Sequence, residues 1–188
     1  MLNVATRQKY LKALGFYTGK VDGITGDKTR AAYLALQKKY FTREKDVDGV
    51  YGNNTEILLK SAYNVSFCTK NFELEEFKCK CGKYCTGYPV VIDAQLLRNL
   101  QTLRDKYGAI TITSALRCEK HNSLVGGTSG SRHKRGKAAD IKCFVSKIET
   151  GRKAIMALWK TLPKQRYTYC NIGGSYPQMG SSVHIDVV

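Results

Sequence analysis

The chain has 188 residues, which is enough for one ordinary domain or two small ones, and its 43% hydrophobic content indicates a folded protein rather than a disordered one. No apolar stretch is long enough to cross a membrane, and the first residues, MLNVATRQKY, lack the apolar core of a secretory signal, so we expect a soluble protein made in a cytosol. The net charge of +16 favours polyanionic partners, but it fits nucleic acid, anionic cell-wall polymers or a solvated basic face equally well.

An internal repeat occupies the first third of the chain. It reads VDGITGDKT at residues 21–29 and VDGVYGNNT at residues 47–55. Asp-Gly followed by a second Gly marks a tight turn that needs positive φ, and we expect Thr29 and Thr55 to cap or begin the helices that follow. Apolar residues at helical spacing before the first turn and after each turn predict a three-helix unit that closes near Tyr63.

The segment LGFYTGKVDGITGDKT, together with the repeated turn, resembles the small three-helix peptidoglycan-binding module over roughly residues 3–65. This resemblance implies that a first domain, residues 1–65, binds the bacterial cell wall and carries out no chemistry. The wall-binding residues that it implies lie in the two turns: Asp22, Gly23, Asp48 and Gly49.

The second part of the chain alternates between helical and strand patterns. Residues 93–108 have leucines at helical spacing, with Asp93 as the N-cap and Gly108 at the exit. A strand is predicted at 109–117, and HNSLVGGTSGS then reads as a glycine-rich loop. The remaining elements are a strand at ADIKCFV, a helix at IETGRKAIMALWKTL with Ile148, Ile155, Leu158 and Trp159 facing the core, and a final strand at SSVHIDVV. The fold class is therefore α+β, with a central antiparallel sheet in a second domain, residues 66–188.

Seven cysteines, an odd number, exclude a complete set of disulfides within one chain. Cys79, Cys81 and Cys85 cluster in CKCGKYC, which fits either a metal site or free thiols in a turn-rich loop. Their spacing differs from the paired spacing of standard zinc modules, so the pattern favours free thiols and leaves the metal site open.

The three histidines include two in distinctive contexts. His133 and Asp140 are separated by six residues that include Gly136 and two alanines, so the chain can turn and both side chains can reach one ion. In SSVHIDVV, strand alternation places His184 and Asp186 together on the face opposite the apolar residues. Two histidines and one aspartate make a plausible catalytic zinc shell, although each residue alone also fits a surface position or a hydrogen-bonded strand position.

SALRCEKHNSLVGGTSGSRHKRGKAADI, followed by VHIDV near the end, resembles the M15 family of zinc D-Ala-D-Ala carboxypeptidases and endopeptidases over roughly residues 71–188. The family motif Ser-x-His-x6-Asp matches Ser131, His133 and Asp140, and its late histidine matches His184. The resemblance implies that His133, Asp140 and His184 bind Zn²⁺.

The same resemblance assigns roles to residues around the metal. The family's Ser-x-x-Arg matches Ser114 and Arg117, which implies that Arg117 binds a substrate carboxylate or the developing oxyanion, a task that suits a guanidinium. Ser114, Ser131 and Tyr176 are expected to contact the substrate.

The proton acceptor departs from the family pattern. Many members have an acidic residue three positions before the late histidine, and this chain has Ser181 there. Asp186, which we count among the catalytic residues, is the nearest acid, and it either acts as the general base or orients a metal ligand, with the second role favoured. His121 has either a proton-transfer role or a structural one.

Together these features predict an endolysin of a bacteriophage, a bacteriolytic zinc hydrolase that is made in the host cytosol, released through holin pores and cuts peptide bonds of peptidoglycan, with L-Ala–D-Glu as the first candidate bond. We expect a monomer that binds peptidoglycan and anionic wall polymers and does not bind nucleic acid. The alternatives are a D,D-carboxypeptidase that trims stem peptides, a wall-binding protein without activity, and a nucleic-acid binder supported by charge alone.

Overall fold

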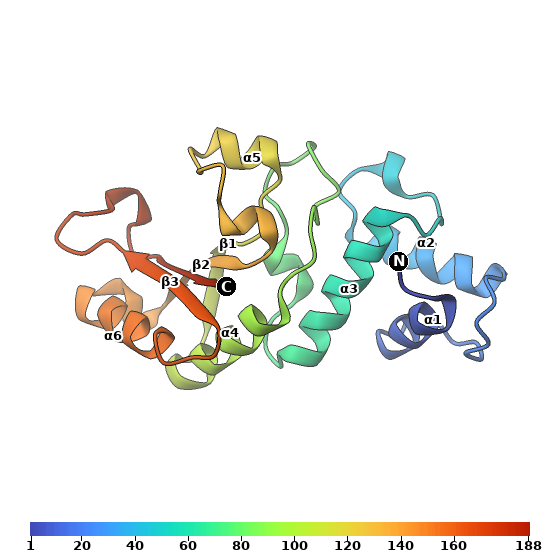
Figure 1. The fold of residues 1–188 in the computed structure, drawn as a ribbon, viewed down its shortest axis with the longest axis horizontal. Helices are drawn as coiled ribbons and strands as arrows, with labels where there is room; N and C mark the ends of the chain where they lie inside the picture. Colours follow the sequence, from blue (N-terminus) through green and yellow to red (C-terminus); the bar gives the residue numbers. More distant parts are fainter.

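The computed structural model describes all of residues 1–188, as an α-helical part followed by an α+β part, as the sequence predicts (Figure 1). None of the helices combines the length and the apolar character that a membrane crossing requires. The helices are α1 (Val4–Ala13), α2 (Asp27–Tyr40), α3 (Asn53–Cys68), α4 (Ala94–Tyr107), α5 (Glu119–Leu124) and α6 (Glu149–Trp159). The strands are β1 (Ile110–Ser114), β2 (Ala138–Cys143), β3 (Gln165–Cys170) and β4 (Val183–Val187).

The first repeated turn is held by a buried glutamine from a neighbouring helix. The side-chain amide of Gln8, on α1, donates to Asp22 Oδ1 at 2.8 Å, to the carbonyl of Ile24 at 3.0 Å and to Thr29 Oγ1 at 3.2 Å. Its oxygen accepts the backbone N–H groups of Asp22 and Gly23. Gln8 is fully buried, so these contacts satisfy every polar atom of its amide.

The second turn repeats this arrangement around Gln37 of α2. Its amide donates to Asp48 Oδ1, the Val50 carbonyl and Thr55 Oγ1, and its oxygen accepts the N–H groups of Asp48 and Gly49. The two repeated segments, residues 21–29 and 47–55, therefore form the same hydrogen-bonded turn. Thr29 and Thr55 are not the N-caps of their helices. Gly26 and Gly52 occupy the N-cap positions, and the two threonines lie buried in the first helical turn.

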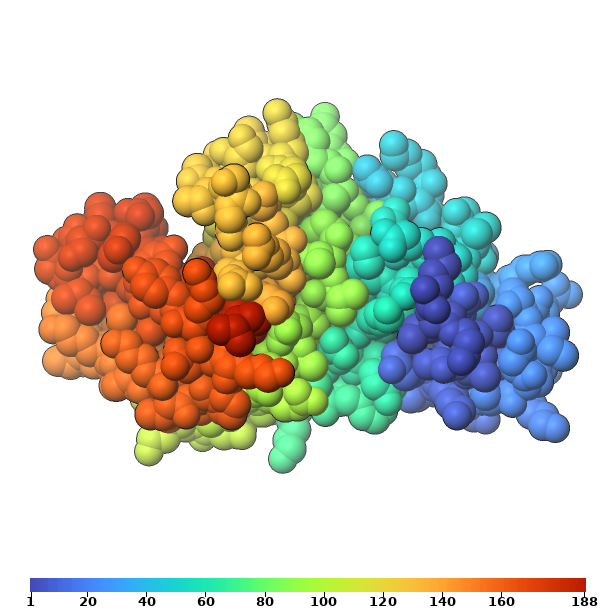
Figure 2. Space-filling model, viewed as in Figure 1, coloured from blue at the N-terminus to red at the C-terminus, as the bar shows by residue number.

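Helix α3 packs against both parts of the protein. It contacts α1 and α2 on one side and α4 on the other, where Asn64 donates to the carbonyl of Ile92 at 2.8 Å and Ser61 accepts the N–H of the same residue. The buried apolar residues of the whole chain form one continuous cluster, and the space-filling view shows the two parts in contact along this helix (Figure 2). Because α3 continues to Cys68, it runs through the expected boundary between residues 65 and 66.

The sheet is antiparallel and has four strands in the order β1-β2-β4-β3. Helix α6 packs on β3 and β4, and α4 contacts both α6 and β4. Val183, Ile185 and Val187 are buried, as the alternation of SSVHIDVV predicts. Strand β3 was not predicted, because its residues QRYTYC are mostly polar or aromatic and lack the apolar alternation that marks a buried strand face.

Two further expectations for the second part are corrected. The segment after β1 is not a plain glycine-rich loop, because it begins with the short helix α5. Ile148 does not face the core: it is 64% exposed at the start of α6, whereas Ile155 and Trp159 are fully buried. Helix α4 follows the prediction closely, with the Asp93 carboxylate accepting the N–H groups of Gln95 and Leu96.

Candidate active site

Three elements bring His133, Asp140 and His184 together on one side of the sheet. Asp140 on β2 is paired with His184 on β4 in the strand register, so their side chains lie side by side. His133 comes from a short 3₁₀ helix, Arg132–Arg135, that precedes β2. The possible ligand atoms of all three residues lie within 4.8 Å of one another, and all three residues are buried.

Gly136 allows the chain to turn between His133 and Asp140. It ends the 3₁₀ helix in the left-handed conformation, with φ of 69°. A Cβ at this position would lie 2.1 Å from the carbonyl oxygen of Val91, so no other residue fits there without a shift of the backbone. The sequence-based argument that small residues let the two ligands converge is consistent with this geometry, since Ala138 and Ala139 are also buried.

The hydrogen bonds of the two histidines determine which ring nitrogens face the cluster. His133 Nδ1 lies 2.7 Å from the carbonyl oxygen of Ala115, which can only accept, so Nδ1 carries the proton and Nε2 offers its lone pair. Nε2 lies 3.4 Å from Asp140 Oδ1. His184 Nδ1 lies 2.8 Å from the same oxygen. One carboxylate oxygen and two ring nitrogens thus converge on a common point.

Asp186 lies behind His184. Its Oδ2 is 3.4 Å from His184 Nε2, the ring nitrogen on the far side from Asp140, and its Oδ1 accepts the backbone N–H of Tyr167 at 2.8 Å. Arg166 pairs with Oδ2 at 3.3 Å. A carboxylate in this place accepts the Nε2 proton and leaves Nδ1 free as a ligand, which is the orienting role rather than that of a base facing the substrate.

Arg117 bridges the loop after β1 and the ligand cluster. Its Nη2 donates to Asp140 Oδ2 at 2.7 Å, and its Nε donates to Ser114 Oγ at 2.9 Å. Ser114 therefore orients the guanidinium. With Nε and Nη2 engaged, Nη1 is the nitrogen left for a substrate oxygen.

The electrostatics of the cluster favour a cation. Burial alone would raise the pKa of Asp140, but the adjacent His133 and His184 rings outweigh it and hold the pKa below its ordinary value. Burial lowers the pKa of His133 and keeps that ring neutral. Burial acts on His184 in the same direction, but its bonds to Asp140 and Asp186 prevail and raise its pKa. The site thus combines an ionised carboxylate with two imidazoles.

Two tyrosines, Tyr169 and Tyr176, lie beside His184, and only Tyr176 was predicted from the sequence. Tyr169, on β3, stacks on the His184 ring with centroids 4.6 Å apart, and Tyr176 packs on Tyr169 at 4.9 Å. Tyr176 thus reaches the site through Tyr169. Burial raises the pKa of Tyr169, so its hydroxyl stays protonated as a donor. Tyr169 was not predicted because it lies on β3, a strand that was not predicted either.

The other predicted residues occupy different places. Ser131 is the residue from which the 3₁₀ helix of His133 starts, and its side chain makes no capping bond. Ser181 lies beside Thr111 and Lys142, farther along the sheet. His121 does not join the ligand cluster, because its Nδ1 lies 3.4 Å from the sulfur of Cys79.

The residues fit a zinc ion. Two imidazole nitrogens and one carboxylate oxygen, with no fourth protein ligand, are the donor set of catalytic zinc sites, which keep a position open for water. The far nitrogen of each ring is occupied by a hydrogen-bond acceptor, Ala115 or Asp186, as the ligand role requires.

Comparison with protein families agrees with this site. The family model described as Peptidase M15 matches residues 70–186, which is more than half of the chain. The chain belongs to the Peptidase M15 family. This is a family of zinc metallopeptidases that act on peptidoglycan, so His133, Asp140 and His184 lie in a domain that uses zinc.

A second family model, that of a peptidoglycan binding domain, matches residues 2–59 of this M15 peptidase. The chain is therefore a cell-wall peptidase that carries its own peptidoglycan-binding domain. A search of curated proteins found no match.

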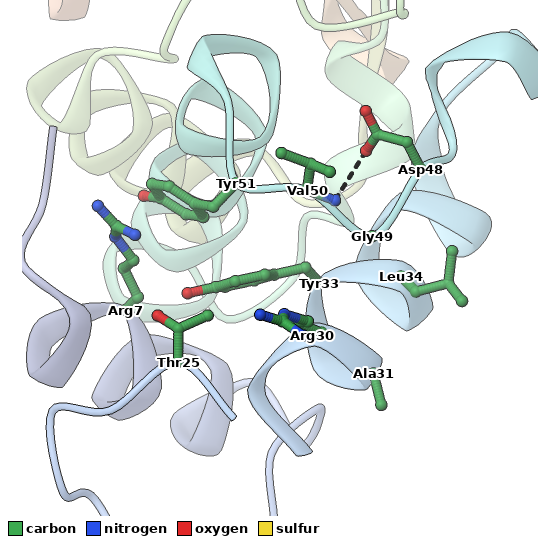
Figure 3. A pocket seen from close by; sticks show the side chains of 10 residues that line it. All are labelled: Arg7, Thr25, Arg30, Ala31, Tyr33, Leu34, Asp48, Gly49, Val50 and Tyr51. Atoms are coloured by element: carbon green, nitrogen blue, oxygen red, sulfur yellow. Dashed lines mark hydrogen bonds between the residues drawn. The ribbon is translucent and has the colours of Figure 1, made fainter. Parts of the chain in front are cut away.

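The peptidoglycan-binding domain of this M15 peptidase contains a groove beside the second repeated turn. Its volume is about 670 Å³. The lining residues, drawn in Figure 3, are Arg7, Thr25, Arg30, Ala31, Tyr33, Leu34, Asp48, Gly49, Val50 and Tyr51. The Arg7 guanidinium lies over the Tyr51 ring, 3.9 Å from its centroid, and the hydroxyl of Tyr33 has no hydrogen-bond partner in the protein. Cations and aromatic rings around a groove suit a sugar polymer that carries carboxylates.

The predicted wall-binding residues relate to this groove in different ways. Asp48 and Gly49 line it, whereas Asp22 and Gly23 belong to the other turn. Both carboxylates are engaged within their own turns, since Asp22 Oδ1 and Asp48 Oδ1 each accept from a glutamine and from the backbone two residues on. The geometry therefore gives these aspartates a turn-forming role.

Proposed function

We propose that this M15 peptidase is an endolysin: a zinc-dependent endopeptidase that cuts stem or cross-link peptides of peptidoglycan and lyses the bacterial cell. The observation that carries the proposal is the combination, in one chain, of the His133, Asp140 and His184 cluster with a peptidoglycan-binding domain packed against the peptidase domain. A binding domain of this kind holds the enzyme on the polymeric wall, and the net charge of +16 adds attraction to anionic wall polymers.

The residues around the cluster have separable tasks in this reaction. Zinc held by His133, Asp140 and His184 would supply a Lewis acid and a water of lowered pKa. Arg117 Nη1 donates to the substrate, either to a carboxylate of the stem peptide or to the oxygen that becomes negative in the transition state. Tyr169 supports the His184 ring and presents a protonated hydroxyl beside it. Asp186 orients His184 through Nε2.

The proposed biological setting is a bacteriophage that infects a bacterium. The enzyme is made in the host cytosol, passes to the wall through holin pores and acts as a monomer there, without binding nucleic acid. Among the bonds of the stem, L-Ala–D-Glu is our first candidate, and D-Ala-containing cross-links are the second.

The first experiment compares the wild-type enzyme with His133→Ala, Asp140→Ala and His184→Ala. We expect each variant to lose the zinc of this site and the ability to clear purified cell walls, and full activity in any of them would refute the site. Mass spectrometry of products from defined wall fragments then identifies the bond. New amino termini inside the stem indicate an endopeptidase, whereas release of a terminal D-Ala alone would make the enzyme a carboxypeptidase.

A second experiment separates wall attachment from chemistry. Arg30→Gln removes one cation of the groove, and Lys38→Gln removes an exposed cation from the same helix outside it. We expect Arg30→Gln alone to weaken pull-down by purified walls while hydrolysis of a small soluble stem peptide is unchanged. Wall pull-down without any chelator-sensitive hydrolysis by the wild type would instead identify an inactive binding protein.

A further inference from the structure

Four cysteines converge beside the loop that carries Arg117. Cys79, Cys81 and Cys85 follow a short 3₁₀ helix, and Cys118 lies after β1, directly next to Arg117. The four sulfur atoms all lie within 4.8 Å of one another. The sequence shows only the first three as a cluster, because Cys118 is brought in by the fold.

The sulfur separations match a tetrahedral metal centre. Zinc–thiolate bonds of about 2.3 Å in a tetrahedron place neighbouring sulfurs about 3.8 Å apart. The sulfurs of Cys81 and Cys85 are 3.4 Å apart, which is far longer than the ~2.05 Å of a disulfide bond. All seven cysteines are free thiols in the structure, and Cys68, Cys143 and Cys170 stand outside the group.

Backbone N–H groups around the four cysteines stabilise negatively charged sulfur. The backbone N–H of Cys118 donates to Cys79 at 3.3 Å, that of Gly87 donates to Cys85 at 3.4 Å, and that of His121 donates to Cys118 at 3.4 Å. Such N–H donors stabilise metal-bound thiolates, because four thiolates around Zn²⁺ leave a net charge of −2. Lysines at positions 78, 80 and 83, within the same segment, add positive charge.

The loop itself has the turn that a chelating segment needs. Gly82, directly after Cys81, has φ of 71°, so the chain reverses between Cys81 and Cys85. His121 lies against the group through Nδ1, 3.4 Å from the sulfur of Cys79, where it is placed to act on a ligand rather than on the substrate. This contact explains the position of the one histidine that the active site does not use.

We propose that Cys79, Cys81, Cys85 and Cys118 bind a structural Zn²⁺ ion. Four thiolates fill a tetrahedral shell and leave no position for water, so this ion has no part in catalysis. Its effect is to join the start of the peptidase domain to the loop that holds Arg117. Two backbone hydrogen bonds flank the place where these segments meet. The N–H of Leu116 donates to the Phe77 carbonyl, and the N–H of Arg117 donates to the His133 carbonyl.

The site is tested by metal content, in reductant, on the full chain loaded with zinc and freed of excess metal. We expect two zinc ions per chain in the wild type and one in Cys81→Ser or Cys118→Ser. Cys68→Ser, a half-exposed cysteine outside the group, is the matched control and should keep two. The double variant His133→Ala/His184→Ala should also keep one, so the result does not depend on the proposed activity.

Cobalt substitution gives a readout that needs no cysteine variant. Co²⁺ in a four-thiolate tetrahedron gives intense thiolate-to-metal charge-transfer absorption in the near ultraviolet, which the nitrogen and oxygen ligands of the active site do not produce. We expect this absorption in the wild type and in the His133→Ala/His184→Ala variant. A single metal per chain without thiolate absorption would overturn the proposal, and so would an intact mass of the metal-free chain that is lower by four hydrogen atoms, which indicates two disulfides.

Discussion

The role of Asp186 distinguishes two mechanisms. In one its carboxylate acts as the general base, and in the other it orients His184 as a metal ligand. Its Oδ2 lies 3.4 Å from His184 Nε2, and its Oδ1 is held by the N–H of Tyr167. We therefore predict that Asp186→Asn weakens zinc binding. Loss of such a partner typically costs 10- to 100-fold in metal affinity. Since the 3.4 Å separation is long for a hydrogen bond, we expect about 10-fold, or ~1.4 kcal/mol.

The assay measures the zinc dissociation constant by competition with a chromophoric chelator, and then kcat on a soluble stem peptide at saturating zinc. Most of the activity should return once zinc is saturating. The matched control is Asp105→Asn, an exposed aspartate on α4, which should change neither quantity. Unchanged zinc affinity with a fall in kcat of about 100-fold or more at saturating zinc would refute the orienting role, because general bases contribute on that scale.

Three further predictions follow from buried contacts. Arg117→Lys keeps the charge but lacks the rigid fork that donates to Ser114 and Asp140 at once and directs Nη1 at the substrate. We therefore expect kcat/KM to fall about 100-fold with zinc content unchanged, and a fall below threefold contradicts the role. Gln37→Ala removes the buried amide that binds the partly exposed N–H groups of Asp48 and Gly49. Water can replace some of these bonds, so denaturant unfolding should show a loss of about 1–3 kcal/mol, and no measurable loss contradicts the role. The pKa of Glu56 is lowered, because its bonds to Lys60 and to the N–H of Leu2 outweigh burial, so its stabilisation is present above the unfolded pKa of about 4.3 and disappears as the pH falls through the folded value. Glu56→Gln should therefore be less stable than wild type at pH 7 by about 1 kcal/mol, and the difference should vanish once the pH is below the folded pKa, as urea unfolding would measure.

The ligand set could be predicted from the sequence because its determinants are local. The spacing of His133 and Asp140 with Gly136 between them, and the alternation that puts His184 opposite Val183, are visible in short segments. The α+β order and the capped helix α4 were predicted for the same reason.

The remaining features depend on contacts between distant segments. Gln8 and Gln37 precede their turns by different distances along the chain, so no fixed spacing reveals their shared role. Cys118 meets Cys79 only because the loop after β1 folds back on the start of the domain. Tyr169 was missed with the strand that carries it, since β3 lacks the apolar alternation that marks β4.

Helix α3 has a consequence for anyone who wishes to rebuild this enzyme. Domains are most easily exchanged where a flexible linker joins them, because few contacts cross such a linker. Here the joint is a continuous helix with partners on both flanks, Ser61 and Asn64 among its contacts to the peptidase side. A fusion placed at residue 65 would cut this helix and expose core residues of both parts. A working chimera should carry α3 whole, and its groove and metal centre will then keep a fixed mutual orientation, which limits the bonds within reach of an anchored enzyme.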